Sequence, residues 1–266
     1  MSAASAKPPP IVQQSPDLRP IVPPMRNPPE KRLLKPLPNW QLGLLAPILY
    51  LQGKYVRRVA LRLPPPPGRA QDQQGSGPPF RLLLAGDSSA AGIGAETFEE
   101  GLCGQLVGNL SADYTVAWQL IAKSGASTAS TLSAIKRKAS GDYDLAVIAT
   151  GVNDVTSFVP LEDWLDQQRQ LIDHLTTQHS AKQIILCGVP EVGMFPLLPH
   201  PLKYVLGHQA DAYDQARLRL TEAYENVAYL STRFEGEGLA MANDGFHPGP
   251  AVYREWAKGV ESKLAR

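Results

Sequence analysis

From Phe80 to the C-terminus, short apolar runs alternate with longer segments in which apolar residues recur at helical spacing. The apolar runs predict strands at residues 80–86, 114–122, 143–150, 183–189 and 226–230. The intervening segments predict helices at residues 96–110, 131–139, 161–179, 203–225 and 250–264. Strands that alternate with helices form an open, mostly parallel sheet with helices on both faces. The sequence therefore predicts an α/β domain in this part of the chain.

The residues before Phe80 differ in composition from those that follow. Residues 1–79 carry 11 Lys and Arg against 3 Asp and Glu, whereas residues 80–266 carry 15 against 22. Prolines are also concentrated before residue 80. The formal net charge of the whole chain is only +1, so charge does not indicate a nucleic-acid partner. Two compositions in one chain predict an appendage joined to a compact domain.

The appendage divides into three segments ahead of the domain at residues 80–266. Residues 1–39 are rich in Pro, Ser, Gln and Lys without strand or helix periodicity, which predicts an extended or disordered tail. Residues 40–63 form an apolar and basic segment. Residues 64–79 begin with four prolines and continue with Gly, Ser and Gln, as is typical of a linker.

The apolar run from Leu42 to Leu51 is about half as long as the roughly 20 residues that span a bilayer as a helix. It lies deep in the chain and lacks a small-residue cleavage site, so it does not resemble a secretory signal. Either it forms a helix that packs on the domain, or residues 42–58 make peripheral contact with a membrane, their Lys and Arg facing anionic lipid. Localisation therefore stays open between the cytoplasm and a membrane surface.

Three small motifs directly follow predicted strands, at the end of a parallel sheet where ligands bind. In Gly86-Asp87-Ser88, the glycine allows a sharp turn that lifts Ser88 to the sheet edge. Gly125 follows the second strand and can turn its backbone N–H toward the site. Asn153 follows the third strand and can aim its side-chain amide into the same cleft. Each motif alone is also compatible with an ordinary turn or helix cap.

A fourth motif, Asp244-Gly245-Phe246-His247, precedes the last predicted helix. An Asp three residues before a His can bend back onto the imidazole and hold the ring so that Nε2 faces a nucleophile. His174 and His179 lie on a charged helix, where we expect them to be solvated. A nucleotide-binding domain is disfavoured, because Gly92-Ile93-Gly94 continues into neither a dinucleotide motif nor a phosphate loop.

In order, spacing and placement, these motifs resemble the SGNH (GDSL) hydrolase family, named for its Ser, Gly, Asn and His. The resemblance covers residues 80–264 and implies a flavodoxin-like, three-layer α/β/α domain. It implies that Ser88 is the nucleophile, that His247 is the general base, and that Asp244 fixes the tautomer of the histidine. It also implies an oxyanion hole made of the backbone N–H groups of Ser88 and Gly125 and the side-chain amide of Asn153. The chain reads GDSS where the family's older name has GDSL, at a position that varies among relatives. The N-terminal stretch more loosely resembles that of bacterial members.

The resemblance implies a serine esterase or lipase-like acylhydrolase that needs no metal or organic cofactor and acts on a small-molecule or lipid-like ester. A thioesterase, a carbohydrate deacetylase or an O-acyltransferase would use the same residues. A binding or targeting role of the Pro-rich basic arm is the non-enzymatic alternative. Cys103 and Cys187 have no metal-site spacing, and we expect two buried apolar side chains, with a disulfide left open.

The loop at residues 190–202 is long, apolar and rich in proline. It either packs over the core or forms the wall of a substrate pocket. As a wall, it would suit an acyl chain better than a sugar, because it has few polar groups for hydrogen bonds to a sugar. The pocket residues expected on this interpretation are Val152, Val155, Phe158, Met194 and Phe195.

Overall fold

The computed structural model describes residues 36–234 and 240–264. Most of the predicted tail at residues 1–39 lies outside these ranges. Backbone contacts divide the chain after Arg32, so the segment at 40–63 belongs to the same compact unit as the sheet.

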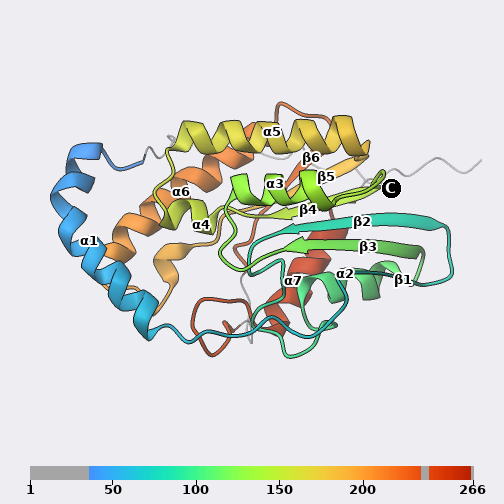
Figure 1. Ribbon diagram of the computed structural model, residues 1–266, viewed down its shortest axis with the longest axis horizontal. Helices are drawn as coiled ribbons and strands as arrows, with labels where there is room; N and C mark the ends of the chain where they lie inside the picture. Colours follow the sequence, from blue (N-terminus) through green and yellow to red (C-terminus); the bar gives the residue numbers. More distant parts are fainter. Residues whose placement is uncertain (1–35, 235–239, 265–266) are drawn as a thin grey trace, which may run out of the picture. The chain divides into compact units, whose positions relative to one another are not determined.

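A six-stranded sheet forms the centre of this unit (Figure 1). In chain order its strands are β1 (Gln71–Gln74), β2 (Pro79–Gly86), β3 (Thr115–Ala122), β4 (Leu145–Ala149), β5 (Gln183–Cys187) and β6 (Val227–Leu230). In space their order is β1-β3-β2-β4-β5-β6, and only the β1–β3 pair is antiparallel. The five predicted strands and the mostly parallel sheet are confirmed.

Strand β1 lies within residues 64–79, where a linker was expected. Its four residues, Gln-Asp-Gln-Gln, are all exposed and have no apolar alternation, so the sequence does not indicate a strand. Pairing with β3 defines it, with Gln71 opposite Gln119 and Gln74 opposite Val116. The sheet therefore begins before the expected boundary at residue 80, and a short polar strand forms its edge.

Helices cover both faces of the sheet (Figure 1). They are α1 (Asn39–Val59), α2 (Leu102–Leu110), α3 (Thr128–Lys138), α4 (Val152–Thr156), α5 (Leu161–His179), α6 (Leu202–Thr221) and α7 (Pro250–Glu261), with a short 3-10 helix at Val192–Met194. Helices α3, α5 and α6 lie on one face, and α2 and α7 lie on the other. The expected helix at 96–110 begins only at Leu102, and the short helix α4 was not predicted.

Alternate residues of the central strands supply two separate cores. In β2, Leu83 and Ala85 pack with α3, α5 and α6, whereas Leu82 and Leu84 pack with α2 and α7. Burial on both faces explains why β2 and β4 read as continuous apolar runs. Cys103 and Cys187 are buried in the second core as free thiols. Burial raises the pKa of each thiol to about 12, so both behave as apolar side chains.

Helix α1 packs on the domain through one of its faces. Leu49 and Val56 are buried in the same core as α6. The Gln52 side chain donates to the His200 carbonyl at 2.7 Å and accepts from the Leu202 N–H at 3.0 Å. Helix α1 therefore packs on the domain through this face, and its other faces stay free of these contacts. Within the described residues, no helix is both long enough and apolar enough to cross a membrane.

Candidate active site

The strand order creates a crevice at the carboxyl ends of β2 and β4. These strands are neighbours, but the chain leaves β2 toward α2 on one face and leaves β4 toward α4 and α5 on the other (Figure 1). Such a switch point opens a gap between the two connections, and ligands of open α/β sheets bind there. Ser88 follows β2 and Asn153 follows β4, so the topology brings both residues to this gap.

A tight backbone turn presents Ser88 at the end of β2. Gly86 cannot be replaced without distortion, because a Cβ there would lie 2.0 Å from the Ala149 carbonyl oxygen of β4. The Asp87 N–H donates to that same oxygen at 3.0 Å, and the Ser88 carbonyl accepts from the Ile93 N–H at 3.0 Å. These bonds fix the backbone on either side of the Ser88 hydroxyl.

The side chains of Asp87 and Asn153 meet behind Ser88. The Asn153 amide nitrogen donates to the Ala126 carbonyl at 3.0 Å and lies 3.5 Å from the Asp87 carboxylate. Burial raises the pKa of Asp87 to about 7, against the lowering effects of the Ser89 N–H and the charge of Arg217. The amide of Asn153 is therefore oriented by the loop after β3 and by Asp87.

The loop that carries Gly125 depends on backbone conformation and on a buried carboxylate. Gly125 has a φ of +76°, and a Cβ there would meet nothing within 4 Å, so conformation rather than space requires glycine. Thr128 ends this loop, and its N–H and hydroxyl donate to the Asp154 carboxylate of α4 at 3.0 and 2.9 Å. Burial raises the pKa of Asp154 although these bonds oppose the shift. Asp154 thus ties the start of α3 to α4.

Asp244 and His247 form the expected pair. Asp244 Oδ2 lies 2.5 Å from His247 Nδ1, and Oδ1 accepts from the N–H groups of Phe246 and His247 at 3.0 Å. Burial alone would raise the pKa of Asp244, but the hydrogen bonds outweigh burial and lower it. An ionised Asp244 therefore engages Nδ1 and leaves Nε2 of His247 for a substrate or nucleophile.

A cavity of about 1210 Å³ has Ser88, Gly125, Asn153 and His247 in its wall. The structure thus brings together the residues that the motifs predicted, with Asp244 buried behind the histidine. Among the described residues, no hydrogen bond joins the Ser88 hydroxyl to His247.

Four of the five expected pocket residues line this cavity: Val152, Phe158, Met194 and Phe195. Val155 does not, because it lies on the inner face of α4 and is 0% exposed in the core. Further lining residues were not predicted: Leu42, Gly43, Ala46, Leu49, Tyr50, Gly53, Val56 and Arg57 of α1, and Leu202 and Leu206 of α6. The apolar run at 42–51 was the available signal for α1, although it did not reveal which face points to the cavity.

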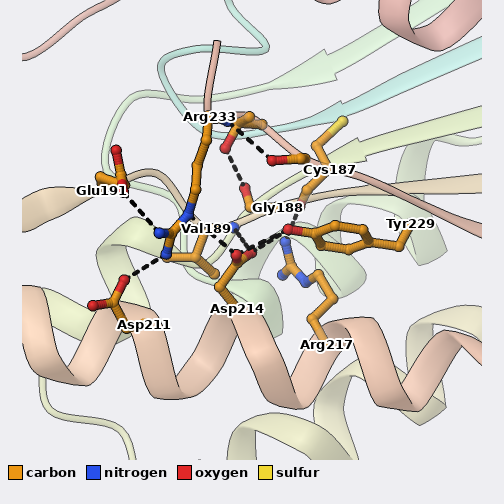
Figure 2. Close-up of polar contacts among 11 residues, drawn as sticks. Cys187, Gly188, Val189, Glu191, Asp211, Asp214, Arg217, Tyr229 and Arg233 are labelled. Atoms are coloured by element: carbon orange, nitrogen blue, oxygen red, sulfur yellow. Dashed lines mark hydrogen bonds and ion pairs between the residues drawn. The ribbon is translucent and has the colours of Figure 1, made fainter. Parts of the chain in front are cut away.

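A buried arginine connects the strand ends beneath the site. Arg217 of α6 is fully buried and donates to two backbone carbonyl oxygens, those of Thr150, which follows β4, and Cys187, which ends β5. Nearby, Asp214 accepts from the Val189 N–H at 2.8 Å and from the Tyr229 hydroxyl at 2.9 Å. Figure 2 shows these groups converging from α6 on the ends of β5 and β6. No motif in the sequence indicated this cluster.

Arg233, at the edge of the cluster, bridges acidic residues on two elements. Its guanidinium lies 2.7 Å from Glu191, 2.5 Å from Asp211 and 3.6 Å from Asp214 (Figure 2). These contacts join the loop after β5 to α6 beside the cavity. In the part of the chain that the structure describes, no group of His, Cys, Asp and Glu residues is arranged to hold a metal ion.

Comparison with known proteins agrees with this geometry. Residues 84–255, more than half of the chain, match the model of the GDSL-like lipase/acylhydrolase family. A search of curated proteins gave no match.

Solved structures of low sequence identity share the fold. A lipase from a goat rumen metagenome is 17% identical, with a TM-score of 0.53, and the match covers 69% of this chain and 96% of the lipase. The esterase EstA from Pseudoalteromonas sp. is 15% identical, with a TM-score of 0.51 over 68% and 94% of the two chains. An acetylxylan esterase from Geobacillus stearothermophilus is 20% identical, with a TM-score of 0.50 over 71% and 95%.

Proposed function

Because the chain belongs to the GDSL-like lipase/acylhydrolase family of ester-hydrolysing enzymes, we propose that it hydrolyses carboxylic esters of medium or long acyl chains through an acyl-enzyme on Ser88. The observation that carries this proposal is one large cavity that has Ser88 and His247 in its wall together with apolar side chains of α1, α6 and the loop after β5. Thioesters, acetylated sugars and acyl acceptors other than water are the alternative substrates for the same site.

His247 takes the proton of the Ser88 hydroxyl as Oγ attacks the ester carbonyl. Asp244 holds the imidazole through Nδ1 and stabilises the imidazolium that forms. The tetrahedral intermediate then expels the alcohol, which receives its proton from His247, and an acyl ester of Ser88 remains. A water molecule attacks this ester with His247 again as base, which releases the acid and restores the Ser88 hydroxyl.

The negative oxygen of the tetrahedral intermediate is stabilised by the backbone N–H groups of Ser88 and Gly125 and by the side chain of Asn153. We expect Asn153→Ala to lower kcat about 10²–10³-fold with little change in KM, since this donor acts mainly in the transition state. Steady-state hydrolysis of a p-nitrophenyl ester measures the effect. Asn109→Ala is the matched control, because its amide contacts Glu261 on α7, away from the cavity. Equal kcat values for Asn153→Ala and the wild type would exclude this role.

Three of the α1 residues in the cavity wall are small, which leaves room for an acyl chain beside the larger ones. Gly43, Ala46 and Gly53 line the cavity, and a Cβ added at Gly43 would meet nothing within 4 Å. A leucine at position 43 would therefore occupy space that the acyl chain uses. Leucine also has a higher helix propensity than glycine, so the substitution does not weaken α1.

We expect the wild type to prefer p-nitrophenyl octanoate and dodecanoate over the acetate, and Gly43→Leu to weaken the preference for the dodecanoate. Exclusion of two methylene groups, at about 0.8 kcal/mol each, lowers kcat/KM for the dodecanoate about tenfold and leaves the acetate unaffected. Gly108→Leu is the matched control, since this helical glycine of α2 also has open space but lies outside the cavity.

Two results would contradict the acyl-chain assignment. One is a preference for the acetate in the wild type together with no effect of Gly43→Leu. The other is turnover of acetylated sugars or of thioesters without turnover of any oxygen ester that carries a longer chain. The second result would make a deacetylase or a thioesterase the better description of the same site.

A further inference from the structure

The outward face of α1 carries a continuous stripe of large apolar side chains. Its members recur every three or four residues along the helix: Trp40, Leu44, Ile48, Leu51, Tyr55 and Val59. Leu44 is 75% exposed and Leu51 is 65% exposed. Isolated exposed apolar residues are normal, but a contiguous stripe of this length is typical of an interaction surface.

Helix α1 has three faces with different surroundings. One is the exposed stripe, and a second, with Leu49 and Val56, packs into the core with α6 and borders the cavity. The third lines the cavity through Gly43, Ala46 and Gly53. At 3.6 residues per turn, Lys54 falls between the stripe and the cavity face, and Arg58 falls at the edge of the stripe on that side. Whatever the stripe binds therefore lies beside the cavity, with basic groups on the side toward the cavity.

The charges on α1 and on the segment that follows it have a single sign. Residues 36–70 contain Lys54, Arg57, Arg58, Arg62 and Arg69 and no Asp or Glu. All five basic residues are exposed. Exposed apolar residues flanked only by Lys and Arg match a lipid surface, where the apolar side chains enter the acyl boundary and the cations face anionic headgroups. A second copy of α1 would bring the same basic charges and no carboxylate to pair with them.

We propose that α1 docks its outer stripe onto a lipid surface that contains anionic headgroups. Docking places the cavity next to the lipid, so that an acyl ester passes from the membrane along the cavity face of α1 toward Ser88. The delivery of substrate rests on the proposed function, whereas the docking itself does not.

Vesicle flotation of the full chain tests the docking. We expect the protein to float with phosphatidylcholine vesicles that contain phosphatidylglycerol and to bind pure phosphatidylcholine vesicles at least tenfold more weakly. Leu44→Glu/Leu51→Glu should lower binding to the anionic vesicles at least about tenfold, because both side chains would leave the acyl boundary. Leu218→Glu is the matched control, since Leu218 is an exposed apolar residue of α6 and should bind like the wild type.

A second pair of variants tests the basic groups. Lys54→Gln/Arg58→Gln should also weaken binding to anionic vesicles about 30-fold, at about 1 kcal/mol for each cation. Neutralising Lys31, Arg32 and Lys35 in the full chain should have a smaller effect. If neutralising Lys31, Arg32 and Lys35 abolishes binding while Leu44→Glu/Leu51→Glu still binds, the N-terminal segment is the anchor and the proposal is wrong.

Other outcomes also overturn the docking. These are equal binding to neutral and anionic vesicles, unchanged binding of Leu44→Glu/Leu51→Glu, and sedimentation that shows a dimer which the stripe variant dissociates. Hydrolysis of soluble p-nitrophenyl acetate, measured in parallel, separates docking from catalysis. The stripe variant should keep the wild-type rate on this ester. Specific vesicle binding without turnover of any ester would support the docking and reject the proposed function.

Discussion

Ser88→Ala is expected to lower kcat for p-nitrophenyl esters by about 10⁴–10⁶-fold and to abolish labelling by a fluorophosphonate. The expected loss is this large because no other group replaces the nucleophile, so that only binding and the oxyanion hole continue to contribute. Ser88 is 7% exposed, and its turn is held by backbone hydrogen bonds that an alanine keeps. The variant should therefore fold like the wild type, as circular dichroism and thermal unfolding can verify.

Ser89→Ala is the control for the nucleophile, because Ser89 is the adjacent serine of the same turn. With this variant, we expect mass spectrometry to find one fluorophosphonate adduct on Ser88, as in the wild type. An adduct on Ser89, or full esterase activity of a folded Ser88→Ala, would place the nucleophile elsewhere. The same experiment reports on His247, since the hydroxyl reacts with the probe only when a base activates it.

The strands of the fold were predictable because buried strands appear in the sequence as runs of consecutive apolar residues. Strands β2 and β4 are buried on both faces and read as continuous apolar sequence. Strand β1 was not predictable, because its four polar residues are recognisable only from their pairing with β3. His179 was expected to be solvated, but it is 7% exposed and its Nδ1 lies 2.8 Å from the Gly141 carbonyl oxygen.

The residues of the site were predictable to the extent that they lie in short motifs. Ser88 follows a strand directly, and Asp244 and His247 are three residues apart, so local sequence contains the signal. The contribution of α1 to the cavity was not predictable, because it depends on how that helix rotates against α6. Val155 was misplaced for a similar reason, since a short helix buries one side and exposes the other. Arg217 is remote in sequence from the strand ends that it joins.

Arg217→Leu is expected to lower the free energy of unfolding by about 3–5 kcal/mol, the usual effect of removing one partner from a buried set of charges. The substitution leaves the carbonyl oxygens of Thr150 and Cys187 without their donor. It also removes the positive charge that lowers the pKa values of Asp87 and Asp154. Denaturation by guanidinium chloride measures the loss. Arg219→Leu, two residues further along α6 and exposed, should change stability by less than about 0.5 kcal/mol.

The loss in Arg217→Leu should grow as pH rises above about 7. In the wild type, burial raises the pKa of Asp87 from 3.8 to about 7, so the folded state binds the proton more tightly than the unfolded state. Such a group stabilises the fold at low pH and loses that contribution as pH rises through the folded-state pKa. Without Arg217, the pKa of Asp87 rises further, and ionising its buried carboxyl becomes more costly. Unfolding at about pH 6 and pH 9 should therefore show the larger difference from wild type at pH 9. An equal difference at both values would mean that Arg217 acts through its hydrogen bonds and packing rather than through its charge.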